Sequence, residues 1–467
     1  MDRRQRGFEA AIAPRIVLAC VTALLSALGP PAARADIVRL LRDDYEAAQA
    51  RVDIIQQAQS EVAIVYYIVD FDNISAMLLA ALRDAADRGV RVRMVIDASK
   101  NTIPDAMQAH LIERGVEIRE YHQGNLLHPC WINRRLHDKV VLSDRCQLIT
   151  GSRNIEDRHF GLACRNFCDR DVYLCGQVAC EAAQYFECLW ASNQIRPTKL
   201  KDFSADCPHV EGDHYWLAQS CVPRLGKRDV AGGKQWASAY LDQAWEILAA
   251  GDMITLDSGN DWSADRPQLP PIPFLYDPGG RKRTTEGTDE AMLDLVNSAE
   301  RSIVIETPYF VASRKLRRAL LSAAARGVEV QVITNSLTST NSKLSYGAYS
   351  NQKRLLLRHG IKLWEFRGPC VLHAKSMVVD CCVSVVGSYN FDPRSEKLNT
   401  EVAVLIRDCC FAQEVRASIA AHQRRAHRIA PDGKALPTTA RHPGADAKDL
   451  RELHCKKFLA LFLKGFI

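Results

Sequence analysis

The chain has 467 residues, of which 47% are hydrophobic and 25% are charged, and its formal net charge is +6. These values are ordinary for a soluble globular protein, and the length leaves room for two or three domains. No stretch is apolar over the roughly 18 residues that a membrane-spanning helix needs, which excludes a protein built from such helices. The small positive surplus is compatible with anionic lipid headgroups or nucleic acid and does not choose between them.

The first 35 residues have the pattern of a targeting segment. Basic residues at positions 3, 4, 6 and 15 precede the apolar run "IVLACVTALLSAL", and Ala33-Arg34-Ala35 follows. This order predicts a secretory signal peptide over residues 1–35, cleaved before Asp36. An uncleaved N-terminal anchor is the alternative. If the signal is used, the protein is exported or membrane-associated, either on the periplasmic side of the inner membrane or secreted.

Helices and strands alternate from residue 36 onward. Apolar residues at 37, 41, 45, 48, 52 and 55 predict an amphipathic helix, because they step by three and four. Runs rich in β-branched residues, of strand length, follow at 62–70, 90–97, 139–144 and 147–152. Glycines at 89, 115, 327 and 360 mark helix ends. The alternation predicts an α/β sandwich, with a mixed and mostly parallel sheet flanked by helices, over residues 36–200.

The sequence repeats itself. The stretch "ALRDAADRGVRVRMVID" at 81–97 returns as "ALLSAAARGVEVQVITN" at 319–335, and further landmarks recur in the same order. A second copy of the domain is therefore predicted at 289–435. The two copies should pack with approximate two-fold symmetry, like a homodimer fused into one chain.

Two segments lie outside the repeat. Residues 201–288 contain Pro- and Gly-rich runs and are predicted to be an inter-domain linker or insertion, with one helix around 236–250. The tail at 436–467 ends in "CKKFLALFLKGFI", an apolar run between lysines. An interfacial helix and a terminal helix docked on the domain are both compatible with this pattern.

The repeat carries a polar motif, H-x-K-x4-D-x6-G-S-x-N, in each copy. Its members are His137, Lys139, Asp144, Gly151, Ser152 and Asn154 in the first copy, and His373, Lys375, Asp380, Gly387, Ser388 and Asn390 in the second. On a strand, residues two apart share a face, so His and Lys of H-x-K point the same way. The Gly-Ser turn brings Ser and Asn back toward that face.

Two copies of this set would form a site for one tetrahedral anion. One imidazole can attack phosphorus while the other protonates the departing oxygen, and lysines and amides stabilise the charge on the remaining oxygens. The catalytic candidates are His137, Lys139, Asp144, His373, Lys375 and Asp380. For the two aspartates a structural role in the hairpin turn is an equally open interpretation. The phosphate-binding candidates are Ser152, Asn154, Ser388 and Asn390.

A carboxylate that holds an imidazole fixes its tautomer and stabilises the imidazolium. Aligning "DRDVYL" at 169–174 with "NTEVAV" at 399–404 makes Asp171 and Glu401 the candidates for this role. Arg158 and Arg394 recur four residues after the motif asparagines, and whether they touch substrate is left open.

Cysteine is frequent, with 16 residues, but no C-x-x-C pair occurs, so a zinc site is not predicted. Cys146, Cys381 and Cys382 lie in apolar, strand-like runs and are expected to be buried free thiols.

The doubled motif resembles the phospholipase D superfamily. The resemblance to bacterial cardiolipin synthases of the C-type branch covers residues 37–430 and rests on the stretches "YYIVDFDN", "RLHDKVVLSD", "GSRNIEDRHFG", "ETPYFV", "VITNSLTSTN" and "GSYNFDPRSEKLNTE". It implies two phospholipase D domains that form one active site without metal or organic cofactor. It also implies a covalent phosphatidyl–histidine intermediate, with His137 as nucleophile and His373 as acid, although the sequence alone does not order these roles.

The resemblance implies a membrane-associated phosphatidyltransferase that makes cardiolipin from phosphatidylglycerol and a second phospholipid. The expected partners are a phospholipid, such as phosphatidylglycerol or phosphatidylethanolamine, and a membrane surface; neither nucleic acid nor a protein partner is predicted. A hydrolytic phospholipase D that releases phosphatidic acid is the nearest alternative. A metal-independent nuclease and a non-catalytic lipid-binding protein are the others.

Overall fold

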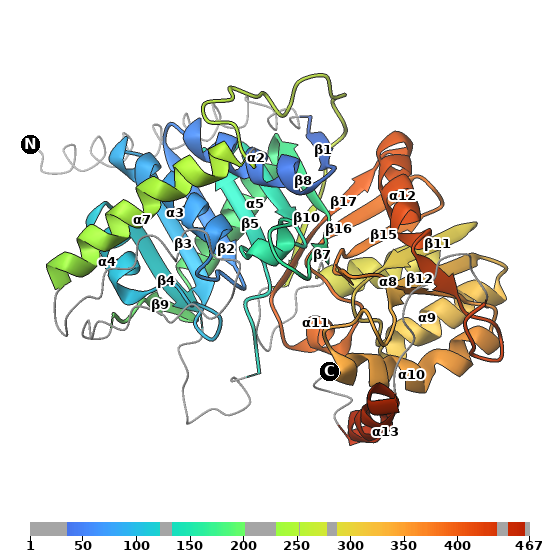
Figure 1. Cartoon of the computed structure of the whole chain (residues 1–467). Coiled ribbons are helices and arrows are strands. Elements are labelled where there is room, and N and C mark those ends of the chain that lie inside the picture. Colours follow the sequence, from blue (N-terminus) through green and yellow to red (C-terminus); the bar gives the residue numbers. More distant parts are fainter. Residues whose placement is uncertain are drawn as a thin grey trace, which may run out of the picture.

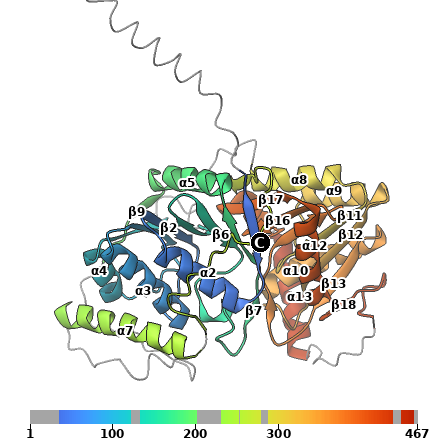
Figure 2. The ribbon, with the colours of Figure 1, turned by 90° about the horizontal axis from the view of Figure 1, so that it is seen from above.

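The computed structural model describes residues 35–121, 133–200, 230–251, 253–277, 287–436 and 447–462. It contains two eight-stranded mixed sheets, which are flanked by helices and lie side by side (Figures 1 and 2). The predicted α/β class and the predicted duplication are confirmed. The predicted signal peptide or anchor lies outside the described residues, apart from Ala35.

The two sheets have the same strand order. From edge to edge the first contains β1 (Ile37–Leu41), β8 (Asp171–Cys175), β6 (Gln147–Gly151), β5 (Lys139–Ser143), β2 (Glu61–Tyr66), β3 (Arg91–Asp97), β4 (Val116–Tyr121) and β9 (Ile195–Pro197). The second contains β10 (Phe274–Asp277), β17 (Glu401–Arg407), β16 (Val383–Gly387), β15 (Ser376–Val379), β11 (Ser302–Glu306), β12 (Glu329–Asn335), β13 (Lys362–Phe366) and β18 (Ala426–Arg428). Each strand thus has a counterpart in the other copy.

Helices cover both sheets. Those of the first copy are α2 (Asp44–Gln56), α3 (Asn73–Asp87), α4 (Asp105–Glu113), the short η2 (Asp157–His159) and α5 (Gln177–Trp190), followed by α7 (Val230–Ala250). Those of the second are α8 (Thr288–Ser298), α9 (Arg314–Ala325), α10 (Lys343–Arg358), α11 (Pro393–Lys397), α12 (Cys409–Gln423) and α13 (Ala447–Phe462). Helices α3 and α9 end just before Gly89 and Gly327, whose φ angles of 87° and 91° are left-handed, as the glycines predicted.

The predicted parallel majority is wrong. Parallel pairing in the two eight-stranded sheets is confined to β2–β3–β4 and β11–β12–β13. Strands β5 and β6, like β15 and β16, are joined by short turns and pair antiparallel. A short hairpin can join antiparallel strands only, whereas parallel strands need a long crossover.

The first predicted helix begins too early. Residues 37–41 form β1, which pairs antiparallel with β8, and the helix starts at Asp44. The side chain of Asp43 caps this start, because its carboxylate accepts a hydrogen bond from Glu46 N at 2.8 Å. Positions 37 and 41 are four apart, a spacing that one face of a helix and one face of a strand share.

The predicted linker contains two elements of the domains. The expected helix is present as α7, and its buried Trp236 and Tyr240 belong to the core of the first domain. Strand β10 forms the edge of the second sheet by pairing with β17. The second domain therefore begins by Phe274 rather than at 289, since the proline-rich stretch before β10 hid this short strand.

The two domains share a hydrophobic core. Helix α5 of the first copy contacts β10 of the second sheet, and α12 of the second copy contacts β1 of the first. A single cluster of buried apolar side chains runs through both sheets and includes Phe186 on α5 and Phe411 on α12. This shared core fixes one domain against the other, so side chains from both can be held in one site.

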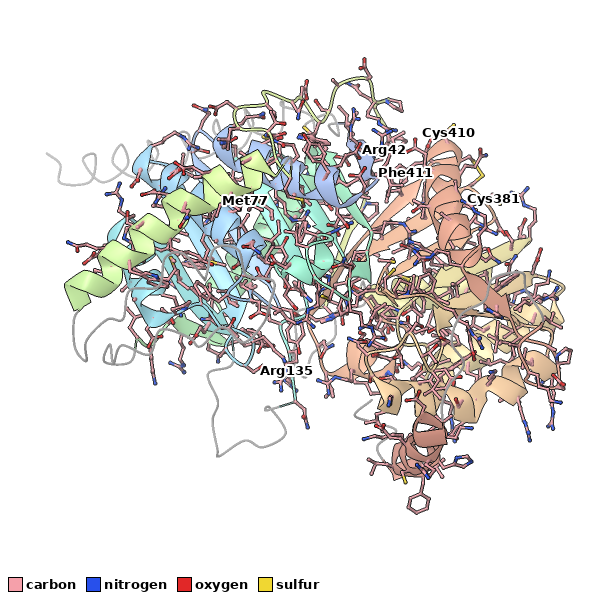
Figure 3. The ribbon with its side chains drawn as sticks, viewed as in Figure 1. Arg42, Met77, Arg135, Cys381, Cys410 and Phe411 are labelled. Carbon is pink, nitrogen blue, oxygen red and sulfur yellow. A yellow bond between two sulfur atoms is a disulfide. The ribbon has the colours of Figure 1, made fainter. Side chains whose placement is uncertain are left out.

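The expectation of buried free thiols at Cys146, Cys381 and Cys382 is wrong. Cys146 and Cys381 are exposed because they lie in the turns that close the β5–β6 and β15–β16 hairpins. Cys382 forms a disulfide with Cys409 at the start of α12. Figure 3 labels Cys381 beside this end of α12.

Helix α13 packs against α10 and keeps an apolar edge exposed. Lys343 Nζ on α10 contacts Asp449 Oδ1 at 2.9 Å and Glu452 Oε2 at 2.7 Å. The exposed apolar edge consists of Phe458 (65% exposed), Leu459 (43%) and Leu461 (48%). Within the described ranges, no helix combines the length and the apolar character needed to cross a bilayer.

Candidate active site

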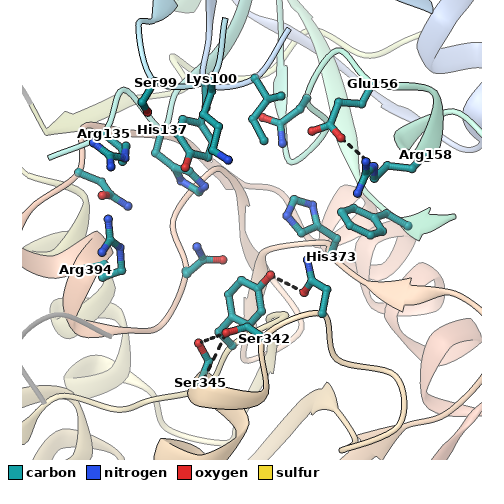
Figure 4. Close-up of a pocket in the computed structure, with 18 of the residues that line it drawn as sticks. Ser99, Lys100, Arg135, His137, Glu156, Arg158, Ser342, Ser345, His373 and Arg394 are labelled. Carbon is teal, nitrogen blue, oxygen red and sulfur yellow. Dashed lines mark hydrogen bonds and ion pairs between the residues drawn. The ribbon is translucent and has the colours of Figure 1, made fainter. Parts of the chain in front are cut away.

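The two motif histidines line one cavity. His137 lies two residues before Lys139, the first residue of β5, and His373 precedes the equivalent strand β15. Both imidazoles border a cavity of about 540 Å³ between the domains, and Figure 4 shows them facing the same space. The duplication therefore brings two imidazoles from distant parts of the sequence to a single site.

Each histidine is held by a carboxylate from the other domain. His137 Nδ1 lies 2.9 Å from Glu401 Oε2, and His373 Nδ1 lies 2.7 Å from Asp169 Oδ1. Both carboxylate side chains are fully buried. Because Nδ1 is engaged in each pair, Nε2 is the ring nitrogen left for chemistry.

The prediction that Asp171 orients a histidine is wrong. Its carboxylate pairs instead with Arg51 Nη2 at 2.7 Å and Arg153 Nη1 at 3.2 Å. In the sheets, Gly151 pairs with Asp171 but Gly387 pairs with Ala403, so the counterpart of Glu401 is Asp169. An alignment shifted by two residues keeps the same strand face, which is why the sequence pattern did not separate Asp169 from Asp171.

The motif glycines allow the strands to approach closely. A Cβ on Gly151 would lie 2.2 Å from Asp171 Oδ1, and one on Gly387 would lie 2.3 Å from Val402 O. The following serines then reach the carboxylates: Ser152 Oγ donates to Asp169 Oδ1 at 2.6 Å. Ser388 Oγ donates to Glu401 in the same way. The predicted phosphate-binding role is thus wrong for Ser152 and Ser388, which hold the carboxylates behind the cavity.

The motif asparagines do line the cavity. Asn154 and Asn390 both border it, and the buried Oδ1 atom of each has no hydrogen-bond partner in the described part of the chain. Buried amide groups are normally paired, so two equivalent unpaired ones beside a cavity point to a polar ligand. The two ends of an amide have nearly the same shape, so a flip would present the NH₂ group to the cavity as a donor instead. Both asparagines remain candidates for contacting phosphate.

The motif lysines are buried beside the histidines. Each ammonium donates to the carbonyl of its own histidine, and Lys375 Nζ also lies 3.1 Å from His373 Nε2. Burial lowers the pKa of Lys139 to about 8 and that of Lys375 to about 7. Burial, followed by the nearby lysine charge, also holds the pKa of both histidines well below the usual value. The negative charge of an anion bound between the two histidines would counter the lysine charge and raise the pKa of both imidazoles.

Asp144 and Asp380 lie away from the cavity, in disagreement with the predicted catalytic role. They lie in the hairpin turns at the far ends of β5 and β15, with φ angles of 49° and 52°. The Asp144 carboxylate accepts hydrogen bonds from the backbone N–H groups of Gln59, Ser60 and Glu61. Asp380 does the same for residues 300–302. These carboxylates tie the hairpin to the start of the neighbouring strand.

Replacing Asp144 with alanine should therefore cost stability and leave turnover intact. Loss of its hydrogen bonds to backbone amides is expected to lower the free energy of unfolding by about 1–2 kcal/mol. Urea denaturation of Asp144→Ala and Asp380→Ala beside the wild type measures this. A fall of more than about tenfold in kcat, with an unchanged unfolding midpoint, would restore the catalytic role.

Several residues of the site were not predicted. His159 Nδ1 lies 2.6 Å from Asp169 Oδ2, so one carboxylate holds two imidazoles, whereas the second copy has Ser395 at the equivalent position. Arg158 and Arg394, left open from the sequence, both line the cavity, as do Lys100 and Arg135. These four cations outnumber the carboxylates of the same lining, which are Asp70, Glu156 and Asp392, so this cationic rim suits an anionic substrate. Of these residues, only Arg158 and Arg394 could be noticed in the sequence, because they recur in both copies.

One trio could in principle hold a metal. Ligand atoms of His159, Asp169 and His373 all lie within 4.8 Å of one another. Both imidazoles, however, direct Nδ1 at the carboxylate. A bound metal would displace the proton between each imidazole and Asp169. His373 would then lose the hydrogen bond that holds it. The arrangement fits a hydrogen-bonded triad better than a metal centre.

Comparisons with known proteins agree with this geometry. A family model described as "Cardiolipin synthase, PLD-like domain" matches residues 52–190 and 292–422. Cardiolipin synthase C of Escherichia coli (strain K12) is 26% identical over 407 residues, which cover 80% of this chain and 82% of that protein. An uncharacterized protein of Helicobacter pylori (strain ATCC 700392 / 26695) is 25% identical over 425 residues, covering 84% and 80%.

Among solved structures, the phosphatidylserine synthase of Haemophilus influenzae Rd KW20 has a similar fold. The TM-score is 0.62, the sequence identity is 15%, and the match covers 92% of this chain and 95% of that one. The two matched segments of the family model each contain one motif, and together they make up more than half of the chain. The chain therefore belongs to the phospholipase D superfamily, in the family of cardiolipin synthase PLD-like domains.

Proposed function

We propose that this protein is a phosphatidyltransferase of the cardiolipin synthase type, which moves the phosphatidyl group of one phospholipid to a hydroxyl of phosphatidylglycerol. The observation that carries the proposal is the pair of imidazoles, each supported by a carboxylate of the opposite domain, on one cavity. The name of the E. coli relative supports a phospholipid substrate. The cationic rim of the cavity supports an anionic one.

The first half-reaction forms a phosphohistidine. Nε2 of one histidine attacks phosphorus as the bond to the headgroup oxygen breaks, and the other histidine gives its proton to that oxygen. The released headgroup alcohol leaves the cavity. In the second half-reaction the acceptor hydroxyl attacks phosphorus, the protonated histidine is regenerated, and the P–N bond breaks.

A difference between the two carboxylates supports an assignment of the roles. Burial raises the pKa of Glu401 to about 7, so this carboxylate is partly protonated near neutral pH. Burial alone would also raise the pKa of Asp169, but His159 and His373 outweigh it and hold this pKa well below the usual value. A carboxylate that stays ionised is the better support for an imidazolium. We therefore assign His373 as the acid and His137 as the nucleophile.

The negative charge of a bound substrate would balance the positive charge of the two motif lysines. Two lysines and two neutral imidazoles favour a phosphodiester anion, and its negative charge then favours protonation of His373. The amides of Asn154 and Asn390 would contact the non-bridging oxygens. With substrate bound, His373 therefore carries the proton that the leaving group needs.

Product analysis with defined lipids tests the proposal. Purified protein is incubated with labelled phosphatidylglycerol, with and without phosphatidylethanolamine, in mixed micelles or vesicles, and the lipid products are separated. Cardiolipin is the expected product. Phosphatidic acid alone would identify a hydrolase that uses water as the acceptor of the same intermediate. Degradation of DNA without added metal, with no lipid turnover, would indicate a nuclease.

The activity should fall on both sides of neutral pH. Below a pH of about 7, Glu401 takes up a proton and no longer accepts the Nδ1–H of His137, so the nucleophile is lost. Above about the same pH, Lys375 loses its charge and substrate anions bind more weakly. The measurement is kcat/KM from about pH 5 to about pH 9. Glu401→Gln, whose amide oxygen accepts at every pH, should lack the acidic limb; an unchanged acidic limb would contradict the assignment.

We also propose that the protein works at a membrane surface through α13. The exposed Phe458, Leu459 and Leu461 lie at its C-terminal end, next to Lys456 and Lys457. Its N-terminal half binds Lys343, which lies between the cavity-lining Ser342 and Ser345. An apolar edge beside lysines, close to the cavity, suits a bilayer that contains anionic lipids.

Replacing Phe458 with serine should weaken binding to vesicles that contain phosphatidylglycerol by about tenfold, since a largely exposed aromatic ring is lost from the contact. Vesicle co-sedimentation measures this, with turnover of a short-chain monomeric lipid as the control for the active site. Leu256→Ser removes an exposed leucine of the first domain and should have no effect. Equal loss in both variants would contradict the role of α13.

A further inference from the structure

A small inter-domain sheet lies beside the active site. Strand β7 (Phe167–Cys168) of the first domain pairs in parallel with β14 (Val371–Leu372) of the second. The backbone N–H groups of His373 and Ala374 both donate to Cys168 O at 2.8 Å. Asp169 follows β7 directly and His373 follows β14 directly, so this sheet aligns the carboxylate with its histidine.

Two thiols and one guanidinium meet on this sheet. Arg425 Nη2 lies 2.9 Å from Cys370 Sγ, and Nη1 lies 3.9 Å from Cys168 Sγ. The two thiols therefore share one guanidinium as a common neighbour. The three residues come from β7, from the turn before β14 and from the end of α12, so the cluster is assembled only in the folded chain.

The guanidinium is held in place by its surroundings. Its central carbon lies 5.0 Å from the centre of the Phe366 ring. Gly368 leaves it room, because a Cβ at that position would lie 2.8 Å from Arg425 Nη2. The Phe366 ring and the space beside Gly368 thus position the guanidinium against the sulfur atoms.

The cluster makes the two thiols unequal. The guanidinium of Arg425 lies closer to Cys370 Sγ, at 2.9 Å, than to Cys168 Sγ, at 3.9 Å, so its hydrogen bond and positive charge favour the thiolate at Cys370 and lower the pKa of that thiol. A thiolate beside a guanidinium, with a second thiol next to it, is the arrangement of a reactive cysteine and its resolving partner. Both side chains are partly exposed, and neither lines the catalytic cavity.

We propose that Cys370 and Cys168 form a site of oxidative modification, at which a peroxide cross-links the two domains. The Cys370 thiolate attacks the O–O bond of the peroxide, forms a sulfenic acid and releases hydroxide, which takes a proton to give water. Cys168 then loses its proton and attacks the sulfenic sulfur; the S–S bond forms and a second water leaves. The two thiols lose two electrons, which reduce one hydrogen peroxide to two waters.

The chemistry of the site does not depend on which lipid the enzyme uses. It rests on the thiol–guanidinium cluster alone, so it stands or falls separately from the proposed function. Cys188 is an exposed free cysteine on α5 and serves as the reference thiol. Arg424, the exposed neighbour of Arg425, serves as the reference arginine.

The test is peroxide treatment of the full-length protein with free thiols, followed by alkylation, digestion and mass spectrometry. We expect a linked peptide that joins Cys168 to Cys370, formed faster than any oxidation of Cys188 and reversed by a reductant. In Cys168→Ser, Cys370 should accumulate as a sulfenic acid that dimedone traps. Arg425→Gln should slow the linkage by about tenfold, and Arg424→Gln should not.

Two results would overturn the proposal. One is the absence of the linked peptide from the wild-type protein at a peroxide dose that already oxidises Cys188. The other is an unchanged linkage rate in an Arg425→Gln variant whose circular dichroism matches the wild type. The wild-type reaction needs no substitution, so the first result does not depend on whether a variant folds.

Discussion

Replacing His137 or His373 with alanine is expected to reduce kcat for phosphatidyl transfer at least about 10³-fold, because each variant lacks either the nucleophile or the proton donor. The two variants should differ in whether they can still form the covalent intermediate. His373→Ala keeps the nucleophile, so with a phospholipid that has an acidic leaving group it should still become labelled at His137. His137→Ala should take up no label. A labelled phospholipid, an alkaline denaturing quench and peptide mapping distinguish the two.

The controls fix the meaning of that result. His359 is an exposed histidine at the end of α10, and His359→Ala should retain full activity. Label on His373 in the His137→Ala variant would reverse the assigned roles. Turnover above about one tenth of the wild-type rate in both alanine variants would remove the histidines from the mechanism altogether.

The positions of the histidines and lysines could be predicted because their spacing is local. His137 and Lys139 are two residues apart, and the β5–β6 hairpin brings Thr150, just before the Gly-Ser pair, back opposite Val140. Strand geometry alone then places them on one face. The two copies confirm each other at an offset of 236 residues, from His137 to His373. Nothing beyond the chain's own periodicity is needed.

The carboxylates could not be placed from that periodicity. Glu401 contacts a histidine as expected, but the histidine belongs to the other domain. The segment between the motif asparagine and the carboxylate is longer in the first copy, with residues 155–168 against 391–400, because it includes β7. Strand alternation fixes the face of residue 169 or 171 but not its register. Register depends on close packing around Gly151, which is a tertiary property.

The exchange of carboxylates has a consequence for the duplicated fold. Neither domain supplies both a motif histidine and its supporting carboxylate, since His137 needs Glu401 and His373 needs Asp169. The shared core of α5 and α12 and the β7–β14 sheet set the distances across the interface. A loosened interface would therefore lower activity before either domain unfolds, which is why the cysteine cluster on that sheet is well placed to affect the site.

Asp169→Asn is expected to lower kcat by about 10³-fold while the protein stays folded. Asp169 accepts hydrogen bonds from Ser152 Oγ and from the imidazoles of His159 and His373. An asparagine keeps the shape but removes the charge that stabilises the imidazolium of the acid. Because the loss concerns the transition state, KM should change little. Steady-state kinetics, with KM and kcat measured separately, test this.

Asp171→Asn is the matched comparison, because the same change is made two residues further along the chain, at the first residue of β8. Asp171 offsets the buried guanidinium groups of Arg51 and Arg153, and its loss should cost about 3–5 kcal/mol of stability. At a temperature where the variant remains folded, its kcat should lie within about tenfold of the wild type. If Asp171→Asn lost turnover and Asp169→Asn lost only stability, the register that places Asp169 against His373 would be wrong.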